Sequence, residues 1–126
     1  MEIVRLSSPD RPFVRAWHAG GFTVGERRYT GSLLLLPDRV EPWRPIDPAA
    51  LAPPDLEPLR PWAGSAVTLV VIGTGLRSQR PSPALCAALR GLGLAFETMS
   101  TPAACRTWNL LLADDRPAAA LLVALP

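Results

Sequence analysis

The sequence has 126 residues, of which 48% are hydrophobic and 19% charged, with a net charge of +2. This predicts one globular domain over residues 1–126. All 13 cationic side chains are arginines, and there are one histidine and two cysteines. These counts exclude lysine-dependent phosphate loops, Schiff-base catalysis, paired-histidine zinc sites and four-cysteine clusters.

The arginines are interspersed with acidic residues, which argues against nucleic-acid binding. The N-terminal residues MEIVRLSSPDRP contain no apolar run of signal-peptide length. The longest apolar run, near residues 66–72, is far shorter than the roughly 20 residues of a membrane-spanning helix. We therefore expect a cytoplasmic protein with no transmembrane segment, and the arginine-, alanine- and proline-rich composition indicates a GC-rich bacterial genome.

The first proline-free window predicts an N-terminal β-hairpin over residues 13–36. Residues 14–24 form its first strand, with a bulge or bend at Gly20 and Gly21. A turn at residues 25–27 leads into the second strand, 28–36. The last part of this strand is continuously apolar, which is typical of a sheet covered on both faces.

Eight of the 15 prolines lie in a connector, residues 37–61. Val40 begins a short strand, and Asp47 precedes Pro48 as the N-cap of a short helix that ends before Pro53. Residues 55–59 form a further turn. Tryptophans and spaced leucines favour packing onto the domain over a disordered linker.

Residues 66–125 alternate between strand and helix patterns. The predicted elements are a strand at 67–72, a helix at 82–91 capped by Ser82, a strand at 94–99, a helix at 102–113 with Thr101 as N-cap, and a strand at 118–125. This order is typical of a right-handed βαβαβ unit. Together with the hairpin it predicts a single three-layer α/β domain with a mixed central sheet.

Two predicted loops follow parallel strands, where α/β proteins bind ligands. One contains Gly73, Thr74 and Gly75, and the other begins at Thr101. If the two strands are neighbours, the loops face each other. The glycines allow a close approach of the backbone to a ligand, or alternatively make room for the neighbouring helix. No third glycine completes a dinucleotide fingerprint.

The helix after Thr101 carries the remaining candidates. Cys105 lies near a helix N-terminus and beside Arg106, which suits a reactive thiol, although a small buried cysteine is the alternative. We expect one of two roles for the polar residues Arg106, Thr107 and Asn109. They bind an anion together with the free backbone N–H groups at the start of the helix (residues 101–104), or they hydrogen-bond to the Gly73–Gly75 loop.

Four segments resemble a known family over nearly the whole chain. These are Tyr29-x-Gly31-Ser32 with Pro37 and Trp43; Ile72-Gly73-Thr74-Gly75; Met99-x-Thr101-x-Ala103-Ala104-Cys105-Arg106-Thr107-Trp108-Asn109; and an acidic residue with Arg116. The pattern is similar to the small-domain family that includes mitochondrial complex I assembly factor 3 and the adipogenesis-associated domain protein.

The resemblance implies a three-layer α/β fold and no known enzyme activity. Ser100 stands where the family often has Asp, and Trp108 where it often has Tyr. A catalytic role that used that carboxylate or phenol would be lost.

We therefore predict a non-enzymatic interaction or assembly protein, with a protein partner and with no catalytic residues, metal or cofactor. The alternative is a small-molecule or anion-binding protein, or a weak enzyme. Its cleft would use the eight candidates Gly73, Thr74, Gly75, Thr101, Cys105, Arg106, Thr107 and Asn109.

Overall fold

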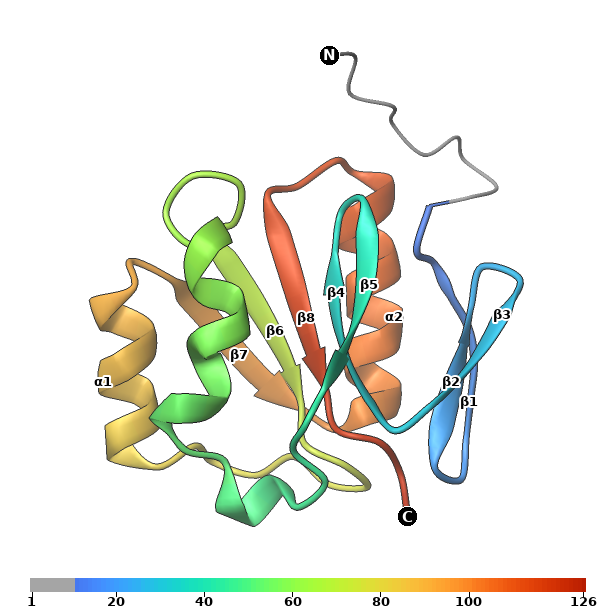
Figure 1. The fold of residues 1–126 in the computed structure, drawn as a ribbon, viewed down its shortest axis with the longest axis horizontal. Coiled ribbons are helices and arrows are strands. Elements are labelled where there is room, and N and C mark those ends of the chain that lie inside the picture. The colour runs from blue at the N-terminus through green and yellow to red at the C-terminus, as the bar shows by residue number, and fades with distance from the viewer. Residues whose placement is uncertain (1–10) are drawn as a thin grey trace.

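The computed structural model describes residues 11–126. Residues 1–10, which hold most of the segment predicted to lack a signal peptide, lie outside the described part. In chain order the elements are β1 (Val14–His18), β2 (Gly21–Val24), β3 (Arg27–Thr30), β4 (Ser32–Leu36), β5 (Arg39–Trp43), the 3₁₀ helices η2 (Pro48–Ala50) and η3 (Pro53–Trp62), β6 (Leu69–Gly73), α1 (Pro83–Gly91), β7 (Ala95–Met99), α2 (Thr101–Ala113) and β8 (Ala118–Leu122) (Figure 1).

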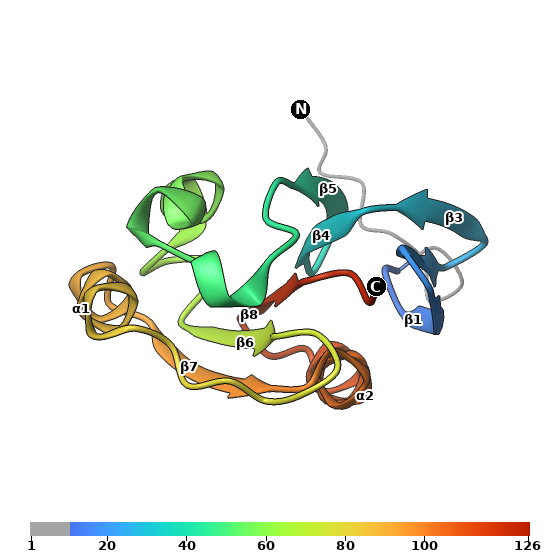
Figure 2. The same ribbon diagram turned by 90° about the horizontal axis from the view of Figure 1, so that it is seen from below.

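The central sheet is mixed, as predicted, with the strand order β5-β4-β8-β6-β7. Strands β6, β7 and β8 are parallel, and β4 runs antiparallel to β8 and to β5. The chain leaves β6 towards β7 and then returns past β6 to reach β8. The two crossovers run in opposite directions over opposite faces, so they have the same handedness (Figures 1 and 2), which for parallel β–α–β connections is right-handed.

The sheet is covered on both faces, which makes the three predicted layers (Figure 2). Because successive strand residues point to opposite faces, Leu34 and Leu36 pack in one core with α1 and η3. Leu33 and Leu35 pack in the other core with α2. All four leucines are buried, which explains the continuous apolar run at the end of the predicted strand.

The predicted hairpin is present with its turn after Val24, but each arm is split in two. Strands β1, β2 and β3 form a separate antiparallel sheet. The first arm folds back at Gly20 (φ 78°), and a Cβ on Gly21 would lie 2.1 Å from the Tyr29 carbonyl oxygen. The second arm breaks at Gly31 (φ 91°), so β3 and β4 belong to different sheets. Left-handed φ values, which glycine tolerates best, cause both breaks.

The proline-rich connector packs onto the domain, as predicted. Asp47 caps η2 by accepting a hydrogen bond from the Ala49 N–H (2.9 Å). The buried Trp43 donates its indole N–H to the Asp55 carbonyl (2.9 Å). The first helix ends at Ala50, before Pro53 as predicted, and Pro53 begins η3, which is longer than the predicted turn.

The helices lie close to their predicted positions. Ser82 caps α1 by accepting from the Leu85 N–H (3.1 Å). The cap of α2 is Ser100 and not Thr101 as predicted, because the Ser100 hydroxyl accepts from the Ala103 N–H (3.3 Å) and Thr101 is already helical. Within residues 11–126, no helix combines the length and apolar character needed to cross a bilayer.

Candidate functional site

The two loops predicted to face each other do meet. Strands β6 and β7 are neighbours, with Gly73 paired to Met99. Immediately beyond them, the Thr74 N–H donates to the Met99 carbonyl (2.9 Å). The carboxyl ends of the two parallel strands are therefore joined, and no cleft opens between them at this point.

Thr101 closes this junction. Its side chain is fully buried. Its hydroxyl accepts a hydrogen bond from the Gly75 N–H (2.8 Å) and donates one to the Val123 carbonyl (2.7 Å). The Thr101 N–H donates to the Gly75 carbonyl (2.7 Å). One residue therefore ties the start of α2 to the segments that follow β6 and β8. We call the group Gly73, Gly75, Thr101 and Val123 the strand-end junction.

Gly73 makes room for α2, the structural alternative stated for these glycines. A Cβ at this position would lie 3.0 Å from both the Cα and the hydroxyl oxygen of Thr101, and 3.1 Å from the Cβ of Ala104. These distances are shorter than ordinary van der Waals contacts. The helix can therefore approach the sheet this closely only beside a glycine.

Thr74 folds the following loop back on itself. Its hydroxyl lies 2.7 Å from the Arg77 carbonyl and 3.1 Å from the Met99 carbonyl, and it accepts from the Gln79 N–H (3.0 Å). Thr74 itself is buried, whereas the loop residues 76–80 are exposed. The exposed loop is thus pinned at its base by a buried hydroxyl.

The N-terminus of α2 offers no free donor for the predicted anion. The N–H groups of Thr101 and Ala104 donate to the carbonyls of Gly75 and Ser100, respectively (2.7 and 2.9 Å). The Ala103 N–H donates to the Ser100 hydroxyl (3.3 Å), and Pro102 has no N–H. The groups that would bind an anion there already have partners within the chain.

Cys105 is the small buried cysteine of the two alternatives. Its exposed fraction is 0%, and burial raises the pKa of its thiol to about 12, although nearby Arg106 acts in the opposite direction. A thiol reacts as the thiolate, so burial and a raised pKa disfavour reaction of Cys105 near neutral pH. The structure therefore favours the small buried cysteine over the reactive thiol.

The other three α2 candidates point to different parts of the molecule. Asn109 clamps β1: its side-chain oxygen accepts from the Val14 N–H and its amide donates to the Val14 carbonyl, both at 2.8 Å. The Thr107 hydroxyl lies 3.3 Å from the Met99 sulfur. The Arg106 guanidinium lies 5.7 Å from the centre of the Trp17 ring. None of these contacts involves the Gly73–Gly75 loop.

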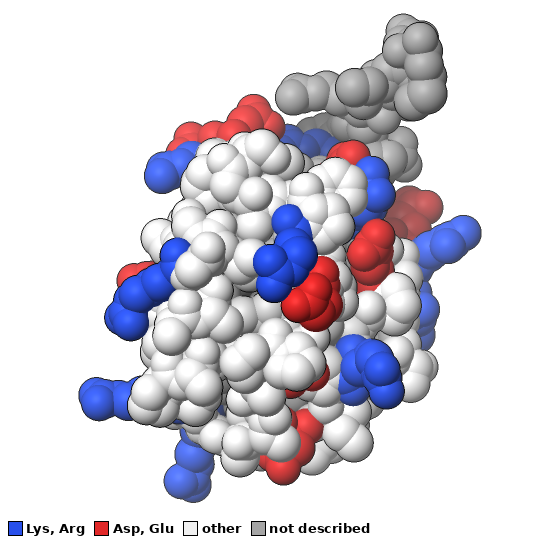
Figure 3. Space-filling view, turned by 60° about the vertical axis from the view of Figure 1, so that its left-hand side comes forward, with Lys and Arg blue, Asp and Glu red and all other residues white. Residues whose placement is uncertain are grey.

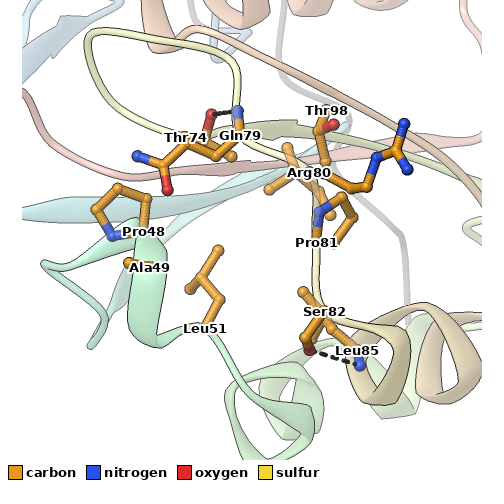
Figure 4. Close-up of a pocket in the computed structure, with 11 residues that line it drawn as sticks. Pro48, Ala49, Leu51, Thr74, Gln79, Arg80, Pro81, Ser82, Leu85 and Thr98 are labelled. Atoms are coloured by element: carbon orange, nitrogen blue, oxygen red, sulfur yellow. Dashed lines mark hydrogen bonds between the residues drawn. The ribbon is translucent and has the colours of Figure 1, made fainter.

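A small pocket lies between η2, the 76–81 loop and the start of α1 (Figure 4). Its volume is about 50 Å³, enough for one or two water molecules. The Ser82 hydroxyl at its rim already caps α1, and Figure 4 shows the Gln79 amide extending towards Pro48. This pocket lies between η2 and the start of α1 and is too small for a metabolite.

A larger groove opens beyond the carboxyl ends of β6 and β8. Its volume is about 640 Å³, within the range of small-molecule sites. We call it the switch-point groove, and it is lined by Gly20, Thr30, Gly31, Ile46, Asp47, Pro48, Thr74, Gly75, Leu76, Arg77, Gln79, Ala124, Leu125 and Pro126. In Figure 1 the ends of β6 and β8, the green segment with η2 and the C-terminus converge at this lower edge.

The groove lies where the direction of the strand order reverses. From β6 the chain moves to one side to form β7, and β8 forms on the other side. In α/β sheets, crevices that bind ligands lie beyond the strand ends at such a reversal. Here Thr101 links the segments that follow β6 and β8 close to the sheet, and the groove lies beyond that link.

Three of the predicted residues, Gly73, Gly75 and Thr101, thus meet in the strand-end junction, and Thr74 and Gly75 also line the groove. Ile46, Leu76 and Leu125 were missed. Leu76 gave a signal, because it is a large apolar residue in an otherwise polar loop. Ile46 and Leu125 come near it only through the lateral order of the strands.

Charge is dispersed on the side that carries α1 and η3. Figure 3 shows arginines and acidic residues dispersed over a largely uncharged face, with side chains of opposite sign next to each other near its middle. Arg60 pairs there with Glu57 on the same helix (3.0 Å), with both side chains largely exposed. Exposed pairs of this kind contribute little to stability.

Comparisons with known proteins agree with the fold and with the predicted resemblance. The chain is 30% identical to NADH dehydrogenase (ubiquinone) 1 alpha subcomplex assembly factor 3 of Bos taurus, over 100% of this chain and 68% of that protein. It is 33% identical to an uncharacterized protein of Rhodobacter capsulatus, over 85% of this chain and 80% of that protein.

A crystal structure described as an outer membrane protein from Bartonella henselae superimposes with a TM-score of 0.85 at 31% identity, covering 94% of this chain and 98% of that one. Residues 14–123 match the family described as protein of unknown function, DUF498/DUF598. The chain therefore belongs to the DUF498/DUF598 family.

Proposed function

We propose that this protein is a non-enzymatic assembly factor that holds a protein partner during the construction of a respiratory NADH dehydrogenase. The observation that carries the proposal is the similarity to NADH dehydrogenase (ubiquinone) 1 alpha subcomplex assembly factor 3, which extends over 100% of this chain. Similarity of this extent includes both sheets and both α-helices, so the shared property is the whole fold and not one motif.

The arrangement of polar groups supports an interaction role. The hydroxyls of Thr74 and Thr101 and the amide of Asn109 all hydrogen-bond within the chain. Cys105 is buried and its thiol pKa is raised to about 12. These four polar or thiol side chains therefore stabilise the fold, which favours an interaction role for the outer surface.

Deletion of the gene in its native host tests the proposal. We expect less fully assembled NADH dehydrogenase on native gels, accumulation of a smaller subcomplex, and restoration when the chain is supplied from a plasmid. A tagged copy should co-purify with subunits of that subcomplex. Normal amounts of assembled enzyme in the deletion strain, with no such subunits recovered, would refute the proposal.

Cell fractionation in the same strain tests the predicted cytoplasmic location. The tagged chain should appear in the cytoplasmic fraction, with a membrane-associated portion that increases when the subcomplex accumulates. Recovery only from the periplasm or the outer membrane would contradict this part of the proposal.

A further inference from the structure

The switch-point groove has the properties of a binding site for an amphipathic molecule. Three large hydrophobic side chains are exposed among the described residues: Ile46 (80%), Leu76 (68%) and Leu110 (73%). Two of the three, Ile46 and Leu76, line this one groove, together with Leu125. Neighbouring exposed apolar side chains around a concave surface are typical of a ligand site.

The wall that carries Leu76 is held in place before any ligand binds. The Thr74 hydroxyl bonds to the Arg77 carbonyl and to the Gln79 N–H at the two ends of the exposed turn (2.7 and 3.0 Å). Thr74 is itself fixed by its backbone N–H, which donates to the Met99 carbonyl (2.9 Å). Binding therefore requires little ordering of the loop, which favours affinity.

Two charged side chains line the groove, and their situations differ. Asp47 already accepts a hydrogen bond from the Ala49 N–H as the cap of η2 (2.9 Å). The side chain of Arg77 makes no ion pair or hydrogen bond with any of residues 11–126. A guanidinium has five N–H donors and binds carboxylates and sulfonates through a planar fork. Arg77 therefore supplies the groove with a positive charge and with hydrogen-bond donors that have no partner among residues 11–126.

We propose that the switch-point groove binds a small amphipathic anion, with its apolar body against Ile46, Leu76 and Leu125 and its anionic group on the Arg77 guanidinium. The observations that support it are the groove's position at the strand reversal, its volume of about 640 Å³, its apolar rim and its single free cation among the described residues. The inference does not depend on the proposed assembly function, since it rests on the geometry of the groove alone.

The test uses the full chain and two kinds of probe. Titration with the aromatic sulfonate 8-anilinonaphthalene-1-sulfonate should give a saturable, blue-shifted fluorescence at one site per chain. Decanoate should displace the dye, and decyltrimethylammonium, which has the same chain length and the opposite charge, should displace it at least tenfold less well. No saturable binding, or equal displacement by both surfactants, would overturn the proposal.

Substitutions test which side chains bind the anionic group of the ligand and which contact its apolar body. Arg77→Gln should weaken dye binding by about three- to tenfold, and Arg28→Gln, an exposed arginine on β3 outside the groove, should leave it unchanged. Leu76→Ser should weaken binding by a similar factor. Leu110→Ser, equally exposed but on α2, is its matched control. Asp47→Asn keeps a capping side chain and should strengthen binding by about twofold.

A protein occupant would give a different result. If Leu76→Ser reduces self-association measured by sedimentation while dye affinity is the same in every variant, the groove is an interface between copies of the chain and the proposal is wrong. Circular dichroism of each variant should match the unmodified protein, because all the substituted side chains are exposed.

Discussion

The strand-end junction and the switch-point groove both lie beyond the carboxyl end of β6 and share Gly75, but they use the strand end in opposite ways. Beneath α2, the polar groups that follow β6 and β8 bond to one another through the buried hydroxyl of Thr101. Farther from the sheet, the segments that follow these strands leave apolar side chains exposed around a groove.

This difference shows that a position beyond the carboxyl ends of parallel strands is not by itself a ligand-binding site. Neighbouring loops that cover the same edge can satisfy each other's polar groups and close. Beyond these contacts, the loop after β6 and the segment after β8 line a groove that has space for a ligand. The junction should therefore determine stability and the groove should determine binding, and substitutions can separate these two effects.

The largest effect on stability is expected at Thr101. Thr101→Val keeps the shape of the side chain but removes the hydroxyl, which leaves the Gly75 N–H and the Val123 carbonyl without their present partner in a buried place. We expect a loss of about 3 kcal/mol in the free energy of unfolding. Guanidinium denaturation followed by tryptophan fluorescence measures this value.

Thr107→Val is the matched control for that experiment. The Thr107 side chain is half-buried on the same helix and its hydroxyl contacts only the Met99 sulfur (3.3 Å), so its removal should cost less than about 1 kcal/mol. Equal losses for the two variants would show that the junction contributes no special stability.

A smaller loss is expected from Gly73→Ala. The added methyl group would lie 3.0 Å from backbone and side-chain atoms of Thr101, so α2 must move away from the sheet, at a cost of about 2 kcal/mol. Gly91→Ala at the end of α1 is the control, since a Cβ there has no neighbour within 4 Å. That variant should be neutral or up to about 1 kcal/mol more stable, and a stable Gly73→Ala protein would contradict the tight contact described for α2.

Much of the fold could be predicted because local signals decide it. Ser82 before Pro83 and the leucine spacing that follows define α1, and the cap formed by Asp47 defines η2. The alternation of strands and helices after residue 66 predicts right-handed crossovers, because parallel strand–helix–strand connections almost always have this hand. The bulge or bend predicted at Gly20 and Gly21 is a complete fold-back of the chain, and the break at Gly31 was missed, because a glycine is also compatible with a continuous strand.

The candidate site was harder to predict because its partners are distant in sequence. The Thr101 hydroxyl bonds to residues 26 and 22 positions away, and Asn109 clamps Val14 from 95 positions away. Polar residues near a strand end look alike in a sequence whether they face a ligand or one another. Only the lateral order of the strands, with β8 beside β6, distinguishes these outcomes.

The pKa of Cys105 reports how well the core beneath α2 excludes water. Burial raises its thiol pKa from 9.0 to about 12, so the folded state holds this proton more tightly than the unfolded state does. The stabilisation is complete below pH 9 and is lost as the pH rises towards 12, by at most about 1.4 kcal/mol per pH unit. We expect Cys105→Ala to remove this part of the alkaline loss in denaturation curves measured at several pH values.

Thiol alkylation at pH 8 gives an independent measurement of the same property. Iodoacetamide should modify the half-buried Cys86 and leave Cys105 unmodified until the chain is denatured. Peptide mapping of the modified protein distinguishes the two cysteines. Modification of Cys105 in the folded state at the rate of Cys86 would contradict the burial of the α2 face.

The smallest effect on stability is expected in the groove. Leu76 is 68% exposed, so Leu76→Ser buries nothing new and removes little packing. The free energy of unfolding should change by no more than about 0.5 kcal/mol, as it should for Leu110→Ser. The same Leu76 variant is expected to lose most of its dye affinity, whereas Thr101→Val should lose stability and, while folded, keep that affinity. A groove variant that unfolds the protein, or a junction variant that binds the dye less well while still folded, would show that the strand-end junction and the switch-point groove are coupled.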